Sequence, residues 1–130
     1  MKTATLCAHI PSTAAGTDDQ WYVAIPWLGK WAIDYIAFAP ATAVALHASN
    51  FTTVTISAND GSGGSDTTVA THKTETTGGT ALVLKTTVAP TVTQPSTPLQ
   101  RGHQIKIGKA DSGTGAILDG SYTIALRKVG

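Results

Sequence analysis

The feature that most constrains the fold of this chain is its abundance of threonine combined with a near absence of glutamate. Threonine recurs from Thr3 to Thr123, often in pairs such as Thr52-Thr53, whereas Glu75 is the only glutamate. Surface helices are usually built from Glu, Lys, Gln and Ala, and β-branched side chains suit the pleated surface of a sheet. The composition therefore predicts an almost entirely β fold and disfavours most sites that are built on helices.

The length and charge of the chain limit its domain count and its partners. A chain of 130 residues with a net charge of +1 is long enough for one domain with a single core. Charged residues make up 13%, about half of the ~25% that is usual in globular proteins, and no basic run occurs. We therefore expect no nucleic-acid partner. Such a surface fits either contact with other proteins or a neutral soluble domain.

The N-terminal segment predicts an unprocessed protein. Cys7 is the only cysteine, so it has no partner for an intrachain disulfide, and we expect it to be buried in an early strand. Threonines, His9 and Pro11 interrupt the apolar stretch that a signal peptide needs. No segment approaches the ~20 apolar residues that span a bilayer. We expect synthesis in a cytoplasm and no membrane partner.

Alternating apolar residues between turn signals predict eight or nine short strands. This pattern is typical of a β-sandwich, and long loops between the strands favour an eight-stranded jelly roll over an immunoglobulin-like fold. We expect a single sandwich domain over residues 21–130, preceded by an N-terminal strand and arm over residues 1–20. The strands are expected at residues 3–10, 21–27, 31–38, 43–48, 51–58, 67–76, 81–88, 103–107 and 122–129. Alternation predicts that Val54 and Ile56 point inward and that Tyr122, Ile124 and Leu126 share one face. Apolar residues on both faces of 31–38 predict a central strand that is covered on both sides.

Motifs that would carry chemistry are weak in this sequence. The loop 60–66 resembles a calcium loop, but Thr71 stands where an EF-hand needs a bidentate Glu. The Gly-rich segment 108–115 lacks the lysine of a phosphate loop. The four histidines show no paired ligand spacing, and no pair of acidic residues stands out. We expect no enzyme activity, no catalytic residues, no metal and no cofactor.

The aromatic residues are concentrated in one segment. Rigid aromatic side chains at the edge of a sheet can anchor a protein interface or stack on a sugar, and three tryptophans within eleven residues exceed what one small core needs. The alternative is that they fill the sandwich core, which we expect of at least one of them. The interface candidates are Trp21, Tyr22, Trp27 and Trp31.

Two stretches give the chain a resemblance to a known family. Residues 35–44 form a strand that ends in Ala-Pro-Ala, and residues 101–107 precede a Gly/Asp-rich loop and a last strand at 122–129. This layout, over residues 31–130, resembles the small jelly-roll decoration or cement proteins that coat the heads of tailed bacteriophages. The resemblance implies a structural protein on the capsid surface of the virion. Its implied partners are the major capsid protein and further copies of itself. The low charge, the surplus tryptophans and the N-terminal arm favour a small closed oligomer, for which we expect a homotrimer, with a dimer as the open alternative.

Two other functions remain open from the sequence. The chain could be a carbohydrate-binding or receptor-binding module of a phage tail or fibre, with Trp27 and Trp31 as a stacking platform. It could also be a small hydrolase or lyase on a jelly roll, which the missing acidic and metal-ligand pairs disfavour.

Overall fold

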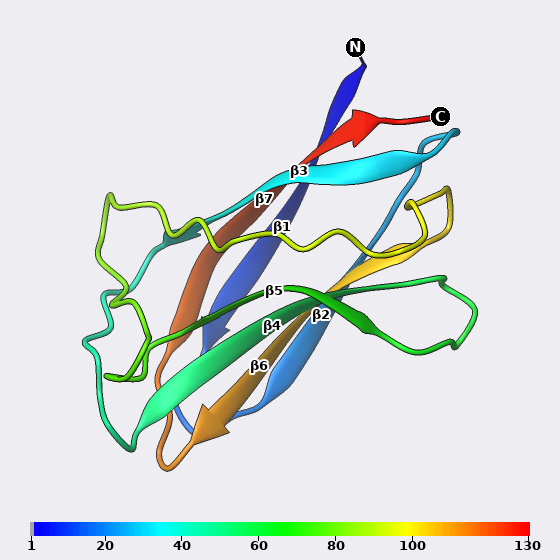
Figure 1. The fold of residues 1–130 in the computed structure, drawn as a ribbon. Coiled ribbons are helices and arrows are strands. Elements are labelled where there is room, and N and C mark those ends of the chain that lie inside the picture. The colour runs from blue at the N-terminus through cyan, green and yellow to red at the C-terminus, as the bar shows by residue number, and fades with distance from the viewer. Residues whose placement is uncertain (1) are drawn as a thin grey trace.

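The chain folds into two antiparallel sheets that are built from seven strands (Figure 1). The computed structural model describes residues 2–130. The all-β prediction is confirmed, and the two sheets form a β-sandwich. The strands are β1 (Thr3–Thr13), β2 (Asp19–Ala24), β3 (Trp31–Pro40), β4 (Phe51–Asn59), β5 (Thr67–Lys73), β6 (Gln104–Ser112) and β7 (Leu118–Lys128).

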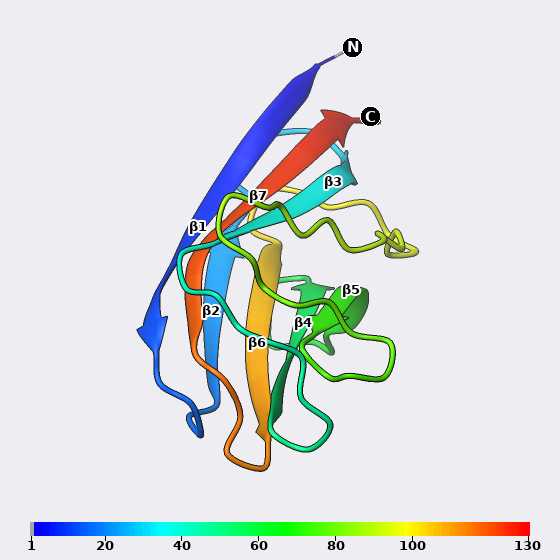
Figure 2. The ribbon, with the colours of Figure 1, turned by 90° about the vertical axis from the view of Figure 1, so that its left-hand side faces the viewer.

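The strand pairs are nested in the sequence around the connection between β4 and β5, so that early strands pair with late ones. The three-stranded sheet has the order β1-β7-β3, and the four-stranded sheet has the order β2-β6-β4-β5 (Figure 2). Strand β4 pairs with β5, β2 pairs with β6, and β1 pairs with β7. Strand β3 fits this nested order as well. One of its edges pairs with β7, and the irregular segment 88–99 lies along the other.

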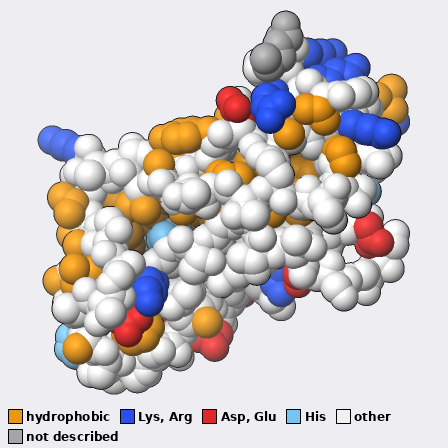
Figure 3. All heavy atoms as spheres, viewed as in Figure 1, with side chains coloured by type: hydrophobic (Ala, Val, Ile, Leu, Met, Phe, Trp, Pro, Cys, Tyr) orange, Lys and Arg blue, Asp and Glu red, His pale blue; other side chains and the backbone are white. Residues whose placement is uncertain are grey.

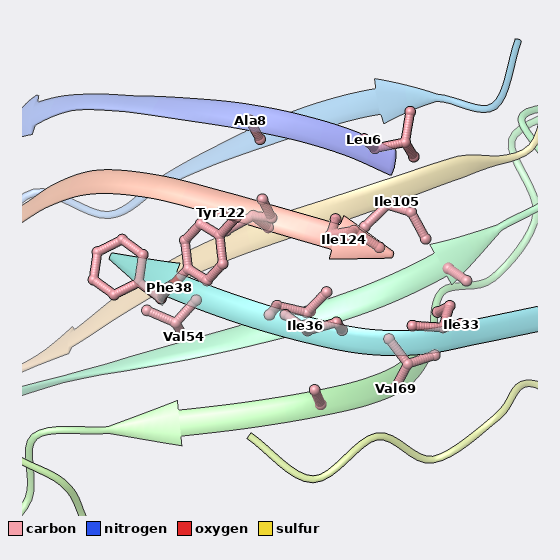
Figure 4. Packing of buried hydrophobic residues seen from close by; sticks show 14 of the residues in the cluster. Leu6, Ala8, Ile33, Ile36, Phe38, Val54, Val69, Ile105, Tyr122 and Ile124 are labelled. Carbon is pink, nitrogen blue, oxygen red and sulfur yellow. The ribbon is translucent and has the colours of Figure 1, made fainter. Parts of the chain in front are cut away.

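The core lies between the two sheets and follows the alternation of apolar side chains. Figure 4 shows Tyr122 and Ile124 of β7 beside Phe38 and Ile36 of β3, and these side chains face Val54 and Ile105 of the other sheet. The sequence prediction that Val54 and Ile56 point inward is confirmed, as is the prediction that Tyr122, Ile124 and Leu126 share one face. Burial of apolar surface in this layer is the main stabilising contribution to the fold.

Strand β3 buries one face only, although its sequence predicts two apolar faces. The register between β3 and β7 shifts between Ile33 and Tyr35, so that Asp34 is the extra residue of a β-bulge. A bulge reverses the alternation of side chains along the strand. Trp31 and Ile33 before the bulge are therefore buried on the same side as Ile36 after it, while Tyr35 is 46% exposed.

The prediction of eight strands is wrong, because two predicted strands do not form. Residues 43–48 and 81–88 contact each other through a single bridge between Val44 and Leu82. The segment 88–99 runs along β3, but Pro90, Pro95 and Pro98 interrupt its pairing. Proline cannot donate a ladder hydrogen bond, so this segment remains irregular.

The prediction of an N-terminal arm is also wrong. Strand β1 pairs with β7 from Thr3 to Thr13, and its Leu6, Ala8 and Ile10 side chains are buried in the common core. Cys7 lies in this strand, as expected, but it is exposed, because the alternation that buries Leu6 and Ala8 turns it to the outer face.

Candidate interaction surfaces

One buried titratable pair lies inside the core and stabilises it. His72 of β5 and Tyr122 of β7 form a hydrogen bond across the two sheets, with 2.5 Å between Nε2 and the hydroxyl oxygen. Burial lowers the pKa of His72 to about 4 and raises the pKa of Tyr122 well above its usual value. Phe38 stacks on both rings. His72 is therefore a neutral structural residue that ties the two sheets together.

A second polar network fixes the loop between β1 and β2. Lys109 Nζ donates to Asp111 Oδ2 at 2.6 Å, to the Thr17 carbonyl at 2.7 Å and to the Ala14 carbonyl at 3.3 Å. The Asp111 carboxylate also accepts from the Thr52 hydroxyl at 2.6 Å. Hydrogen bonds and the lysine charge hold the pKa of Asp111 below its usual value, against the effect of burial. Each charge has its partners, so the network is a structural clamp.

The loop that resembles a calcium site holds its own side chains. Asp60 Oδ1 accepts from the Ser62 amide at 2.8 Å, and Asp66 accepts from Asn59 and from Lys106. Within residues 2–130, no three His, Cys, Asp or Glu side chains come close enough to hold a metal ion together. The arrangement of this loop is that of a hydrogen-bonded turn.

Two of the four outer sheet edges are covered by the chain itself. Along β3, Trp31 exchanges backbone hydrogen bonds with Leu99, and Phe38 does so with Val88. Between these two pairs, the side-chain amide of Gln94 replaces a peptide group, because it accepts from the Ile33 amide at 3.0 Å and donates to the Ile33 carbonyl. Along β5, the Val69 and Lys73 carbonyls accept from the amides of Thr93 and Thr80.

The other two edges, β1 and β2, lie together on the opposite side of the sandwich, which we call the open side (Figure 2). The edge of β2 carries features that discourage further pairing. The Asp19 carboxylate accepts from the Gln20 amide at 2.7 Å, and Pro26 follows the strand closely. Charged residues and proline are common protection for edge strands.

Strand β1 has no such protection from Thr3 to Ile10, since Pro11 and a register irregularity follow only near its end. No Lys, Arg, Asp or Glu occurs from Thr3 to Thr13, and its pairing with β7 is regular from Thr3 to Ile10. No segment of the described chain, residues 2–130, pairs with its outer edge. An uncharged, regular and unpaired edge of this length is a template for another strand.

The outer face of the three-stranded sheet carries a central patch of mostly small, uncharged side chains, which we call the neutral face; the salt bridge between Arg127 and Asp34 borders it at the end nearest the termini. Its cross-strand rows, taken from the register of β1, β7 and β3, are Thr5–Ala125–Tyr35, Cys7–Thr123–Ala37 and His9–Ser121–Ala39. These rows contain no Lys, Arg, Asp or Glu. Tyr35 is the one large side chain among them and is 46% exposed. Tyr35 lies at the border of the patch, beside Asp34 and Arg127, and the rows beyond it are uncharged. Depletion of charged residues is typical of the centre of a protein interface.

The four aromatic interface candidates do not form one cluster. Trp31 is 1% exposed and belongs to the core, where its indole donates to the Leu28 carbonyl. Trp27 is partly buried, with its ring centroid 5.6 Å from that of Trp31. Trp21 and Tyr22 lie on β2 at the open side, where Trp21 packs partly against the core and Tyr22 is 50% exposed.

The end of the sandwich near the termini is basic. Lys2 and Lys128 are joined by a backbone hydrogen bond, Lys128 pairs with Trp31, and Lys30 bonds to Gly130. Arg127, next to Lys128 in β7, forms a salt bridge with Asp34. Figure 3 shows Lys and Arg side chains gathered at this end. These cations come from both ends of the sequence and from Lys30, so they form no basic run. The pairing of the strands brings them together.

The chain matches no protein-family model, no curated protein and no solved structure. The described residues form no helix that could cross a membrane.

The neutral face was not predicted from the sequence. Its signal is present as the alternate residues Thr5, Cys7 and His9 of β1, and as the small residues between the buried positions of β7. Assembling them into one face requires the pairing order β1-β7-β3, which the sequence does not state.

Proposed function

We propose that the sandwich is a jelly roll in which segment 88–99 takes the place of the eighth strand. A jelly roll can be described as one long hairpin that folds over so that its strand pairs alternate between two sheets. The pairs β1–β7, β2–β6 and β4–β5, together with the contact of β3 with segment 88–99, support this interpretation. Viral capsid and lectin domains are among the proteins that use this architecture.

We further propose that the protein is a structural component of a tailed-phage virion, which binds the outside of the capsid and stabilises contacts between shell subunits. The observation that carries the proposal is the neutral face, with the exposed Tyr35 at its border. A flat, uncharged sheet surface desolvates at low cost and can be covered by another protein. Many copies on one shell would add avidity to a modest individual contact.

The resemblance over residues 31–130 points to the major capsid protein as the partner. The buried polar groups agree with a structural role, because His72, Lys109 and Asp111 all have partners inside the protein. Because these groups bond to one another inside the protein, we expect a partner to be bound by the surface of the molecule.

The proposal is tested with phage heads that lack their decoration protein. Thr123 lies at the centre of the neutral face and is exposed, so Thr123→Lys places a charge within the proposed contact without disturbing the core. Thr71→Lys is the matched control, because Thr71 is exposed on β5 of the other sheet. In a co-sedimentation assay, we expect the affinity for the heads to fall about tenfold or more for Thr123→Lys and to stay unchanged for Thr71→Lys. Equal binding by both variants would refute a contact through the neutral face.

The carbohydrate-binding alternative loses part of its basis. A stacking platform made of Trp27 and Trp31 requires both rings at the surface, and Trp31 is 1% exposed. Only Trp27 of that pair keeps exposed surface for a sugar.

A further inference from the structure

The unpaired edge of β1 has a defined set of free backbone groups. Lys128 donates its amide hydrogen to the Lys2 carbonyl at 2.9 Å, so the pair Lys2–Lys128 is a hydrogen-bonded pair of the β1–β7 ladder. Hydrogen-bonded and non-hydrogen-bonded pairs alternate along antiparallel strands. The even-numbered residues of β1 therefore bond to β7, while Thr3, Thr5, Cys7 and His9 direct their N–H and C=O groups to the open side.

We propose that this edge pairs with the same edge of a second copy, antiparallel and around a twofold axis beside Leu6. In this register, Thr5 lies opposite Cys7 of the second copy, and Thr3 lies opposite His9 of the second copy. Every free N–H and C=O of these four residues then has a partner, which gives about eight hydrogen bonds between the copies. A twofold contact of this kind is self-complementary and closed.

The second copy is favoured over an unlike strand by the charge of the edge. Natural edge strands avoid pairing with themselves through charged side chains, and β1 has none from Thr3 to Thr13. No like charges meet in the paired strands, since Lys2 falls opposite Ile10 of the second copy. The net charge of +1 also leaves little repulsion between whole molecules.

Pairing would also cover apolar surface that one copy leaves partly exposed. Ala4 of β1, and Trp21 and Val23 of β2, pack against the core but keep exposed area at the open side. In the proposed register, Ala4 lies opposite Ala8 of the second copy. The second β1 therefore extends the inner layer in front of Trp21 and Val23, and it joins the two neutral faces into one continuous surface.

The inference deepens the proposed function, on which it rests for the role of the paired unit, but its tests do not involve the shell. Sedimentation should show a dimer of wild-type protein. The variant Thr5→Pro removes an N–H that points to the free edge and leaves the bonds to β7 intact. It should weaken dimerisation about thirtyfold or more, because two hydrogen bonds are lost for each dimer. Thr5→Val keeps the N–H and is the matched control.

A second experiment fixes the register. In the wild-type background, Thr5→Cys places a new thiol opposite Cys7 of the second copy, at the ~5.5 Å Cα separation of a hydrogen-bonded pair, which a disulfide can span. Mild oxidation should link the two copies covalently in high yield. The same change combined with Cys7→Ser removes the opposing thiol and should give little crosslink.

The outcomes separate the two proposals. A monomer or a trimer of the wild type would overturn the twofold pairing, as would a dimer that Thr5→Pro leaves intact. A monomer that still binds phage heads would overturn the pairing and keep the proposed function. A β1-paired dimer that ignores phage heads would keep the pairing and overturn the proposed function.

Discussion

The clearest test of the structure concerns Trp27 and Trp31, two neighbouring tryptophans with different surroundings. Trp31 is 1% exposed, and its indole donates to the Leu28 carbonyl at 3.1 Å. Trp31→Ala removes one of the largest buried side chains, so we expect the free energy of unfolding to fall by about 3–5 kcal/mol. Trp27→Ala removes a partly buried ring and should cost about 1–2 kcal/mol.

Urea denaturation followed by circular dichroism measures both costs without relying on tryptophan fluorescence. Trp31→Phe is a useful intermediate, because it keeps an aromatic ring in the core and loses the hydrogen bond to Leu28; we expect it to cost about 1–3 kcal/mol. A cost below about 1 kcal/mol for Trp31→Ala would contradict its place in the core. An equal or larger cost for Trp27→Ala would contradict the assigned difference in burial.

Three further predictions follow from the buried groups and the charge distribution. The pKa of His72 is depressed from 6.5 to about 4, so the unfolded chain binds a proton on this histidine at a higher pH than the folded protein does. The free energy of unfolding should therefore drop by up to about 3 kcal/mol as the pH falls from 6.5 to about 4. His72→Phe should flatten this part of a pH series of urea melts, and an unchanged slope would argue against a buried neutral histidine. Lys109→Met leaves Asp111 without its cation and should cost about 3–5 kcal/mol in the same assay; a neutral effect would contradict the clamp on the 14–18 loop. Lys30→Gln combined with Lys128→Gln should lower the salt needed to elute the protein from a cation exchanger more than Lys73→Gln combined with Lys85→Gln, since the first pair lies in the basic end. Equal shifts would contradict that clustering.

The sequence predicts the strands where a regular alternation reflects one buried face. The last strand is the clearest case, because Tyr122, Ile124 and Leu126 alternate and are all fully buried. The prediction of two covered faces for β3 fails because a bulge at Asp34 changes the face within the strand. No residue type signals that bulge, which depends on the partner strand β7.

The predictions that fail elsewhere involve contacts between distant parts of the chain. The segment 88–99 has too many prolines for a ladder, yet it covers β3 through Gln94, whose role depends on where Ile33 lies. The prediction that Cys7 is buried is wrong, because its position next to the buried Leu6 turns its side chain to the outer face. The neutral face combines three strands and could be recognised only after their order was known.

The most direct test of the proposed function is a saturation binding measurement of wild-type protein on phage heads that lack their decoration protein. A decoration protein should bind to a fixed number of copies for each shell subunit and should raise the temperature at which the heads rupture. Both effects should disappear with Thr123→Lys and persist with Thr71→Lys. Absence of saturable binding by the wild-type protein, at concentrations where it is folded, would contradict the role of this chain as a capsid-binding structural protein.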